Sequence, residues 1–155
     1  MGRYKTRKSC ATCGYRNLQT VMEYGDVPLA GDFPSIDKLQ DDKKYNLDIQ
    51  FCPKCALLQT GSIVDADILF KDYRYMSSIG LSSHFEQVAK GIKSKFKPNK
   101  VLEIGSNDGV LLKPLADLGV DAVGVDPATN ICRVAENNGC RVYNDYFNED
   151  FVTKH

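Results

Sequence analysis

The 155-residue sequence has no tryptophan, no excess of either charge and no long apolar run. Twenty lysine and arginine residues balance twenty aspartate and glutamate residues, which argues against a nucleic-acid binder that depends on overall positive charge. The basic residues at the start are not followed by the apolar stretch of a secretory signal, and nothing later is long enough to span a bilayer. We therefore expect a folded cytoplasmic protein without a membrane or nucleic-acid partner, in a compartment where thiols stay reduced.

Cysteine is the residue type that stands out against these absences. Four of the six cysteines form two Cys-x-x-Cys pairs, which are Cys10 with Cys13 and Cys52 with Cys55. Two-residue spacing lets both sulfurs of a tight turn face one ion, and two such turns complete a tetrahedron. Thiolates in this geometry suit zinc, with iron as the main competitor, and four protein ligands leave no open position for a substrate. Cys132 and Cys140 stand alone and are predicted to pack as small apolar residues.

The alternatives for the four paired cysteines are two disulfides, redox-active pairs or chance spacing. Disulfides fit poorly with the absent secretory signal, and neither pair has the βαβ context of a thioredoxin-like site. The segment to about Ile63 is rich in glycine and proline, with strand-like pieces at 18–21 and 47–51 and a charged loop at 37–44. Such a segment cannot bury enough apolar surface alone, so we predict a β-rich zinc-binding domain at 1–64 that a structural metal holds together.

The rest of the chain changes to helical and then alternating patterns. A helical connector is predicted for 65–98, where Ser83 and Glu86 form a capping box and Pro98 ends the helix. From 99 to 155, strands at 101–104, 122–125 and 141–143 alternate with helices at 110–118 and 128–138. This alternation predicts an α/β fold with an incomplete, Rossmann-like parallel sheet. Pro114 should kink the first of these two helices or move its start later.

A glycine loop follows the first of these strands. Its pattern is Glu103-x-Gly105-x-x-x-Gly109, with Asn107 where a dinucleotide fingerprint carries its second glycine. That difference argues against NAD or FAD, and the Walker lysine of a P-loop is also absent. Asp126 ends the second strand, where a carboxylate can accept hydrogen bonds from ribose hydroxyls. The alternative is a plain tight turn, with Asp126 capping the helix that follows Pro127.

The run Val-Leu-Glu-Ile-Gly-Ser-Asn-Asp-Gly109, with Gly-Val-Asp126-Pro after it, resembles the motifs of class I methyltransferases that use S-adenosylmethionine. With the cysteine pairs and Tyr73-Arg-Tyr75-Met-Ser-Ser78, the sequence resembles the sugar C-methyltransferases that act on C3 of nucleotide-linked keto-deoxysugars. The resemblance implies that the methionine end of the cofactor is lined by Glu103, Gly105, Ser106, Asn107, Asp108 and Gly109. It also implies that Asp126 holds the ribose, and that Phe147 lies near the adenine.

For Tyr73 and Tyr75, the resemblance implies a place near the substrate as candidate catalytic residues, and the alternative is packing between domains. In this family a base removes a proton beside the sugar ketone, and the enolate attacks the activated methyl. The resemblance places that base beyond residue 155, so the chain alone is expected to be incomplete and inactive. Further strands, from the same protein or a second chain, would cover the edge of the first parallel strand. The other hypotheses are a non-catalytic, zinc-stapled interaction module with a partial Rossmann unit, and a class I methyltransferase fragment with a different acceptor.

Overall fold

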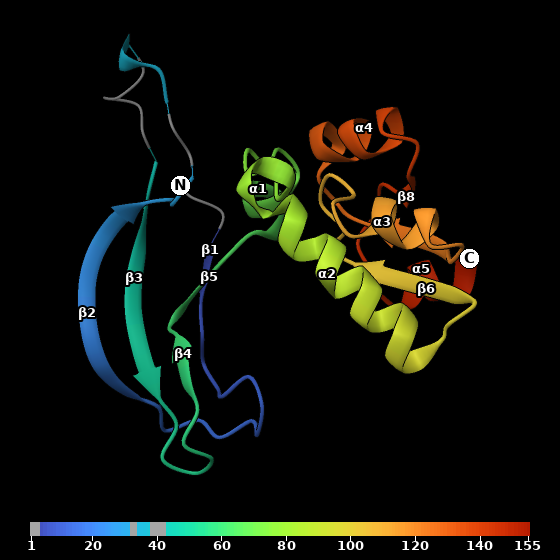
Figure 1. Ribbon diagram of the computed structural model, residues 1–155. Coiled ribbons are helices and arrows are strands. Elements are labelled where there is room, and N and C mark those ends of the chain that lie inside the picture. Colours follow the sequence, from blue (N-terminus) through green and yellow to red (C-terminus); the bar gives the residue numbers. More distant parts are fainter. Residues whose placement is uncertain (1–3, 32–33, 38–42) are drawn as a thin grey trace. The chain divides into compact units, whose positions relative to one another are not determined.

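The structure is a computed structural model, and it describes residues 4–31, 34–37 and 43–155 (Figure 1). The chain divides into two compact units, Met1–Leu69 and Phe70–His155, which are described separately below. The predicted division into three segments at 64/65 and 98/99 stays a prediction. Among the described residues, no helix combines the length and apolar character needed to cross a membrane.

The first unit is built from two small antiparallel sheets. Strand β1 (Tyr4–Thr6) pairs with β5 (Ser62–Val64), and β2 (Gln19–Pro28), β3 (Lys44–Phe51) and β4 (Leu58–Thr60) form the second sheet in that order. The two predicted strand pieces lie in β2 and β3, where Gln19 pairs with Phe51. Strand β2 is longer than predicted and bows in Figure 1, with register shifts at Thr20/Met22 and Glu23/Gly25. Of the predicted charged loop, residues 38–42 lie outside the described residues.

The first unit has little apolar core. Among its described residues, the buried hydrophobic side chains are those of Cys10, Tyr45 and Cys52. Strand β2 exposes Val21, Met22 and Tyr24, and short helix α1 (Ala66–Phe70) buries no residue. Two of the three buried residues are therefore predicted metal ligands. This burial pattern agrees with a fold that depends on a metal for its stability.

The second unit contains a parallel sheet flanked by helices, as the alternating pattern predicts. Its elements in chain order are α2 (Ser78–Phe96), β6 (Lys100–Ile104), α3 (Leu112–Asp117), β7 (Asp121–Val125), α4 (Thr129–Asn137), β8 (Arg141–Tyr143) and α5 (Glu149–Lys154). Strands β6, β7 and β8 are neighbours in that order, and both pairings are parallel. The α/β class and the partial Rossmann-like sheet are therefore confirmed.

The predicted capping box at the start of α2 is wrong. Helix α2 begins at Ser78 and is interrupted at Ile79 and Gly80, where Gly80 has a φ of 82°. Ser83 therefore lies inside the helix and not at its N-cap. The interruption explains the error. The periodic spacing of apolar residues begins only after the kink, so it does not indicate the helical turn that precedes the kink. The other end is as predicted, since the helix stops at Phe96, before Pro98.

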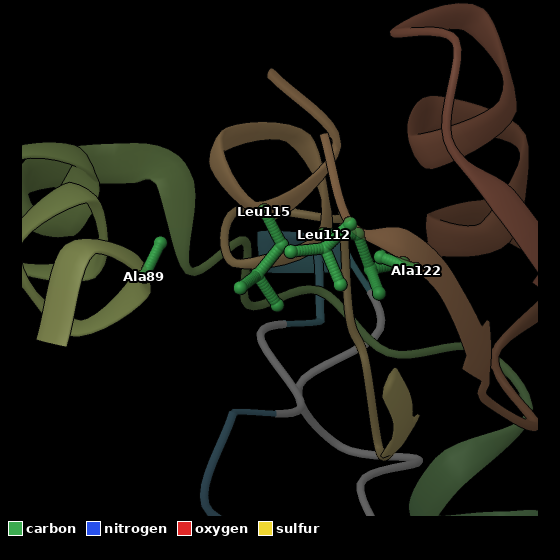
Figure 2. Close-up of a cluster of buried hydrophobic side chains, with 5 residues drawn as sticks. Ala89, Leu112, Leu115 and Ala122 are labelled. Carbon is green, nitrogen blue, oxygen red and sulfur yellow. The ribbon is translucent and has the colours of Figure 1, made fainter. Parts of the chain in front are cut away.

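Helix α3 begins later than predicted, at Leu112, which places Pro114 in its first turn. The first N–H groups of a helix have no partner inside it, so proline is tolerated there. Leu112 and Leu115 of α3 are almost fully buried and pack with Ala89 of α2 and Ala122 of β7. Figure 2 shows the two leucines between these alanines. Cys140 packs against the same cluster and Cys132 is buried, which confirms both as packing residues.

Strand β6 lies at an edge of the described parallel sheet. Leu102 is 48% exposed and Ile104 is 60% exposed, whereas the alternate residues Val101 and Glu103 are partly buried. Successive side chains of a strand point to opposite faces. One face of β6 is therefore apolar and uncovered by the described residues of the second unit, and the covering of this face by further strands stays a prediction.

Candidate metal centre and cofactor site

The two cysteine pairs lie in turns with matching backbone geometry. In the first turn, the Gly14 N–H donates to the Cys10 carbonyl (3.1 Å) and the Cys10 N–H to the Tyr15 carbonyl (2.8 Å). The second turn repeats this pattern from Cys52, with Ala56 and Leu57 in place of Gly14 and Tyr15, at 2.8 and 2.9 Å. The same turn geometry in two distant segments indicates that the two cysteine pairs have the same structural role.

The residue after each second cysteine has a left-handed backbone. Gly14 adopts it at low cost with a φ of 71°, but Ala56 adopts it with a φ of 60°, which is unfavourable for a residue with a Cβ. No residue pattern around Ala56 predicts this conformation. Tertiary interactions must hold this turn in place, and ligation of Cys52 and Cys55 to one ion is an interaction of that kind.

The turns bring all four sulfur atoms within 4.8 Å of one another. The Cys10–Cys55 and Cys13–Cys52 sulfur pairs are each 3.6 Å apart. Zn–S bonds of about 2.3 Å in a tetrahedron place the sulfurs about 3.8 Å apart, so the donor set fits zinc. All six cysteines are free thiols, which does not support the disulfide alternative.

The pKa values of the Cys10 and Cys55 thiols are shifted by nearby backbone groups, by burial and by the neighbouring sulfur atoms. The backbone N–H of Cys13 is the largest influence on Cys10 and lowers the pKa of its thiol to about 6. At Cys55 the N–H of Leu57 acts in the same direction, but desolvation and the neighbouring sulfur atoms outweigh it and raise the pKa to about 12. Four thiolates this close repel one another, and a bound cation would remove that repulsion.

The predicted cofactor loop runs from the end of β6 to the start of α3. Gly105, Asn107 and Gly109 all have positive φ values, at 72°, 48° and 80°. At Gly109, an added Cβ would lie 2.6 Å from the Cys140 sulfur, so both conformation and space require glycine there. The loop passes close to the backbone of β7, because the Gly105 N–H donates to the Val125 carbonyl (2.8 Å).

Asp126 is buried and holds two backbone segments together. Its Oδ2 accepts the N–H of Asn107 and its Oδ1 accepts the N–H of Ala128, both at 2.9 Å. Part of the predicted alternative is therefore seen, since Asp126 does stabilise the turn before α4. Each carboxylate oxygen can accept a second hydrogen bond, so this geometry leaves Asp126 able to accept a ribose hydroxyl.

Three buried polar atoms near this loop have no hydrogen-bond partner among the described residues. They belong to side chains of the predicted cofactor set and are Glu103 Oε2, Ser106 Oγ and Asp108 Oδ1. Buried polar groups in folded proteins are nearly always hydrogen-bonded, so each of these atoms calls for a partner. Desolvation, followed by repulsion from Asp126, raises the pKa of Glu103 to about 7. A raised pKa together with unpaired oxygens is typical of a ligand site.

The backbone of residues Tyr73–Ser78, here called the tyrosine segment, forms hydrogen bonds with side chains of the glycine loop. Asn107 Nδ2 donates to the Tyr75 carbonyl and Asn107 Oδ1 accepts the Ser77 N–H, both at 3.0 Å. Asp108 Oδ2 accepts the Ser78 N–H at 3.0 Å. The rings of Tyr73 and Tyr75 remain exposed, at 38% and 56%. The structure therefore brings this segment, which lies before β6 in the chain, next to the loop that follows β6.

Phe147 and the polar residues Asn144 and Thr129 follow the carboxyl ends of β8 and β7 in the chain. Phe147 follows β8 and is 41% exposed, and the centroid of its ring lies 5.7 Å from that of Phe151. Asn144, which sequence reasoning missed, donates from Nδ2 to the Asp126 carbonyl (3.0 Å) and accepts from Thr129 Oγ1 (2.8 Å). Its position directly after a predicted strand could have singled it out, because the carboxyl ends of parallel strands meet at one edge of the sheet.

A cavity of about 500 Å³ adjoins the loop on the side of α2 and α3. Ser78, Ser82, Asp108 and Gly109 are among its lining residues, whereas Glu103, Gly105 and Asp126 are not. The cavity therefore lies beside the predicted nucleoside site, and it shares with that site only Asp108 and Gly109.

Matches to a family of domains and to two methyltransferases relate this chain to known proteins. Residues 10–70, which contain all four paired cysteines, match the family described as "Putative zinc binding domain". C-methyltransferase NovU of Streptomyces niveus is 30% identical over 156 residues, which cover 94% of this chain and 37% of that protein. Ubiquinone biosynthesis O-methyltransferase of Azorhizobium caulinodans is 40% identical over 58 residues, which cover 37% of this chain and 22% of that protein.

The chain thus spans little more than a third of the length of NovU. The zinc-binding match begins at the first ligand of the predicted metal site, and it supports zinc as the ion. The match to NovU extends through nearly the whole chain, including the parallel sheet. These two findings confirm the resemblance to C-methyltransferases with a zinc-binding domain that the cysteine pairs and the glycine loop predict.

Proposed function

We propose that this chain supplies the zinc-binding domain and the front half of the cofactor site of an S-adenosylmethionine-dependent C-methyltransferase. Its acceptor in this proposal is a nucleotide-linked keto-deoxysugar. The main support is the hydrogen bond from the Asn107 N–H to Asp126 Oδ2, which joins the glycine loop to the acid at the end of the next parallel strand. In α/β sheets, ligands bind at this edge, beyond the carboxyl ends of the strands.

The residues at this edge have chemistry that fits the cofactor. Asp126 would accept a ribose hydroxyl, and Phe147 would offer an exposed ring to the adenine. Glu103, Ser106 and Asp108 would give their unpaired oxygens to the methionine end, where an ammonium group can donate to a carboxylate. The bound cofactor would supply a methyl group activated by its sulfonium. Tyr73 and Tyr75 would lie on the acceptor side.

In this proposal the zinc ion stabilises the fold, because four cysteine ligands fill its tetrahedron. The exposed face and edge of β6 would be covered by further strands of the same protein or by a second chain, in a reducing cytoplasmic compartment. The O-methyltransferase match favours a different acceptor, but it covers 37% of the chain whereas the C-methyltransferase match covers 94%. The C-methyl assignment is therefore preferred.

Calorimetric titration with S-adenosylhomocysteine tests the cofactor site. The wild-type chain should bind this product analogue weakly, and Asp126→Ala should remove the binding. Since Asp126 also accepts two backbone N–H groups, Asp126→Asn, which keeps an acceptor oxygen, should lose affinity with less effect on the melting temperature. Asp121→Ala is the matched control, because Asp121 begins the same strand at its opposite end and is exposed.

Two outcomes would contradict the proposal. A wild-type protein that binds one zinc ion but no S-adenosylhomocysteine would favour the non-catalytic interaction module. Unchanged affinity in Asp126→Ala would remove Asp126 from the site.

For the acceptor, transfer of a labelled methyl group to a nucleotide-linked keto-deoxysugar should occur with the protein from the complete reading frame, and transfer to a phenol alone would favour an O-methyltransferase.

A further inference from the structure

Within the second unit, side chains that follow β6 and β7 hold the tyrosine segment Tyr73–Ser78 through a set of hydrogen bonds. Asn130 Oδ1 accepts the Tyr73 N–H at 3.2 Å, and Asn130 Nδ2 donates to the Tyr73 carbonyl at 2.7 Å. Asn107 and Asp108 hold the other end of the segment through Tyr75, Ser77 and Ser78. All of these bonds run from a side chain of the sheet region to the backbone of the segment.

The three anchoring side chains come from two different parts of the chain. Asn107 and Asp108 follow β6, whereas Asn130 lies in the first turn of α4, after β7. The segment therefore crosses the carboxyl ends of β6 and β7. Because its backbone polar groups make these bonds, the rings of Tyr73 and Tyr75 are not needed to hold it in place, and both remain exposed.

Asn107 links this attachment to the predicted cofactor site. Its backbone N–H donates to Asp126, while its side-chain amide bonds to Tyr75 and Ser77. One residue thus fixes the glycine loop, the acid and the tyrosine segment relative to one another. Its φ of 48° is tolerated by asparagine better than by most residues with a Cβ, which fits a side chain that bonds to nearby backbone.

We propose that Asn130, together with Asn107 and Asp108, forms a backbone clamp that holds Tyr73–Ser78 as one wall of the cofactor site. Asn130 is then a positioning residue, since both of its amide atoms are engaged with Tyr73 and it acts through the segment. A wall that is ordered before the ligand arrives spares the binding step the cost of ordering it. This inference rests on the proposed function, and it identifies a residue that the sequence motifs do not include.

The test measures segment order and cofactor affinity in the same variants of the full chain. In Asn130→Ala, amide hydrogen exchange at Tyr73 should accelerate three- to tenfold, and the affinity for S-adenosylhomocysteine should fall by a similar factor. In Asn107→Ala, exchange at Ser77 should accelerate in the same way. Asn130→Asp keeps the Oδ1 acceptor, so it should retain the protection of the Tyr73 amide and recover part of the affinity. Asn137→Ala, at the exposed last turn of α4, is the matched control and should change neither quantity.

The two readouts separate the possible outcomes. Faster exchange in Asn130→Ala with unchanged affinity would overturn the proposal, because the segment would then not be a wall of the site. Unchanged exchange would also overturn it, because the clamp would not exist in solution. If the wild-type chain does not bind S-adenosylhomocysteine, the proposed function fails and the wall fails with it. The exchange rates would still decide whether the three residues fix the segment.

Discussion

The two units of this chain solve the problem of stability in different ways. In the second unit, Leu112, Leu115 and Ala89 meet in a buried apolar cluster between a sheet and two helices. In the first unit, Cys10 and Cys52 make up most of the buried apolar side chains among the described residues. Chain length does not explain this difference, because the units are of similar size.

In a small unit, a metal site can take the place of an apolar core as the source of stability. A small unit with short strands and exposed β2 residues buries too little surface to offset the entropy of folding. Cross-linking the turns at Cys10–Cys13 and Cys52–Cys55 through one ion adds a free energy that apolar packing does not supply. The second unit buries more apolar surface, so it does not need its cysteines as metal ligands, and they pack as small apolar side chains.

Metal removal should give the largest contrast between the units. Structural zinc contributes about 10–16 kcal/mol of apparent binding free energy in small domains, so a strong chelator should unfold the first unit and leave the second folded. Residue-resolved amide exchange measures this, with loss of protection expected in β2 and β3 and retention in β6 and β7. Cys13→Ser should reproduce the effect.

Cys132→Ala is the control for that experiment, because it removes a buried thiol that lies outside the metal site. Mass spectrometry of the native protein should find one zinc ion per chain in this variant. Persistent protection of β3 in chelator would show that the first unit does not need the ion, and the contrast between the units would disappear.

The converse experiment weakens the second unit. Leu115→Ala removes a fully buried side chain and leaves a cavity, so it should cost about 2–5 kcal/mol of unfolding free energy in that unit. Zinc content should not change. Leu118→Ala, at the exposed end of the same helix, is the control, and urea denaturation measures both. Equal losses in the two variants would contradict the assignment of the core.

A smaller effect is expected at Glu103, where the second unit carries a partly buried carboxyl group. Its pKa is raised from 4.5 to about 7, so the folded state holds a proton that the unfolded state releases. Unfolding free energy should therefore fall as pH rises from about 4.5 to 7. Glu103→Gln should remove this slope and stabilise the unit at pH 8 by about 1–2 kcal/mol, after allowance for partial solvent exposure.

Urea midpoints at pH 5 and pH 8 measure this prediction, with Glu86→Gln on the exposed side of α2 as the control for loss of a charge. A slope that persists in Glu103→Gln would mean that another group produces it. Bound S-adenosylhomocysteine should reduce the slope if its ammonium group donates to Glu103, since a cationic partner favours the ionised carboxylate.

The features that depend on near neighbours in the chain could be predicted from the residues alone. Cysteine spacing identified the four cysteines whose sulfur atoms come together, glycine and Asp126 identified the edge of the sheet, and apolar alternation identified β6, β7 and β8. These patterns are local, because turn geometry and strand periodicity are set by residues a few positions apart.

Contacts between segments that are far apart in the sequence became visible only in the folded structure. The interrupted start of α2, the raised pKa of Glu103 and the hydrogen bonds between Asn130 and Tyr73 all involve groups far away in the chain. A hydrogen bond between Asn130 and Tyr73 leaves no periodic trace in the sequence, because it requires the chain to fold before the two residues are neighbours. The four cysteines that come together could therefore be predicted from the sequence, whereas the contact between Asn130 and the tyrosine segment required the fold.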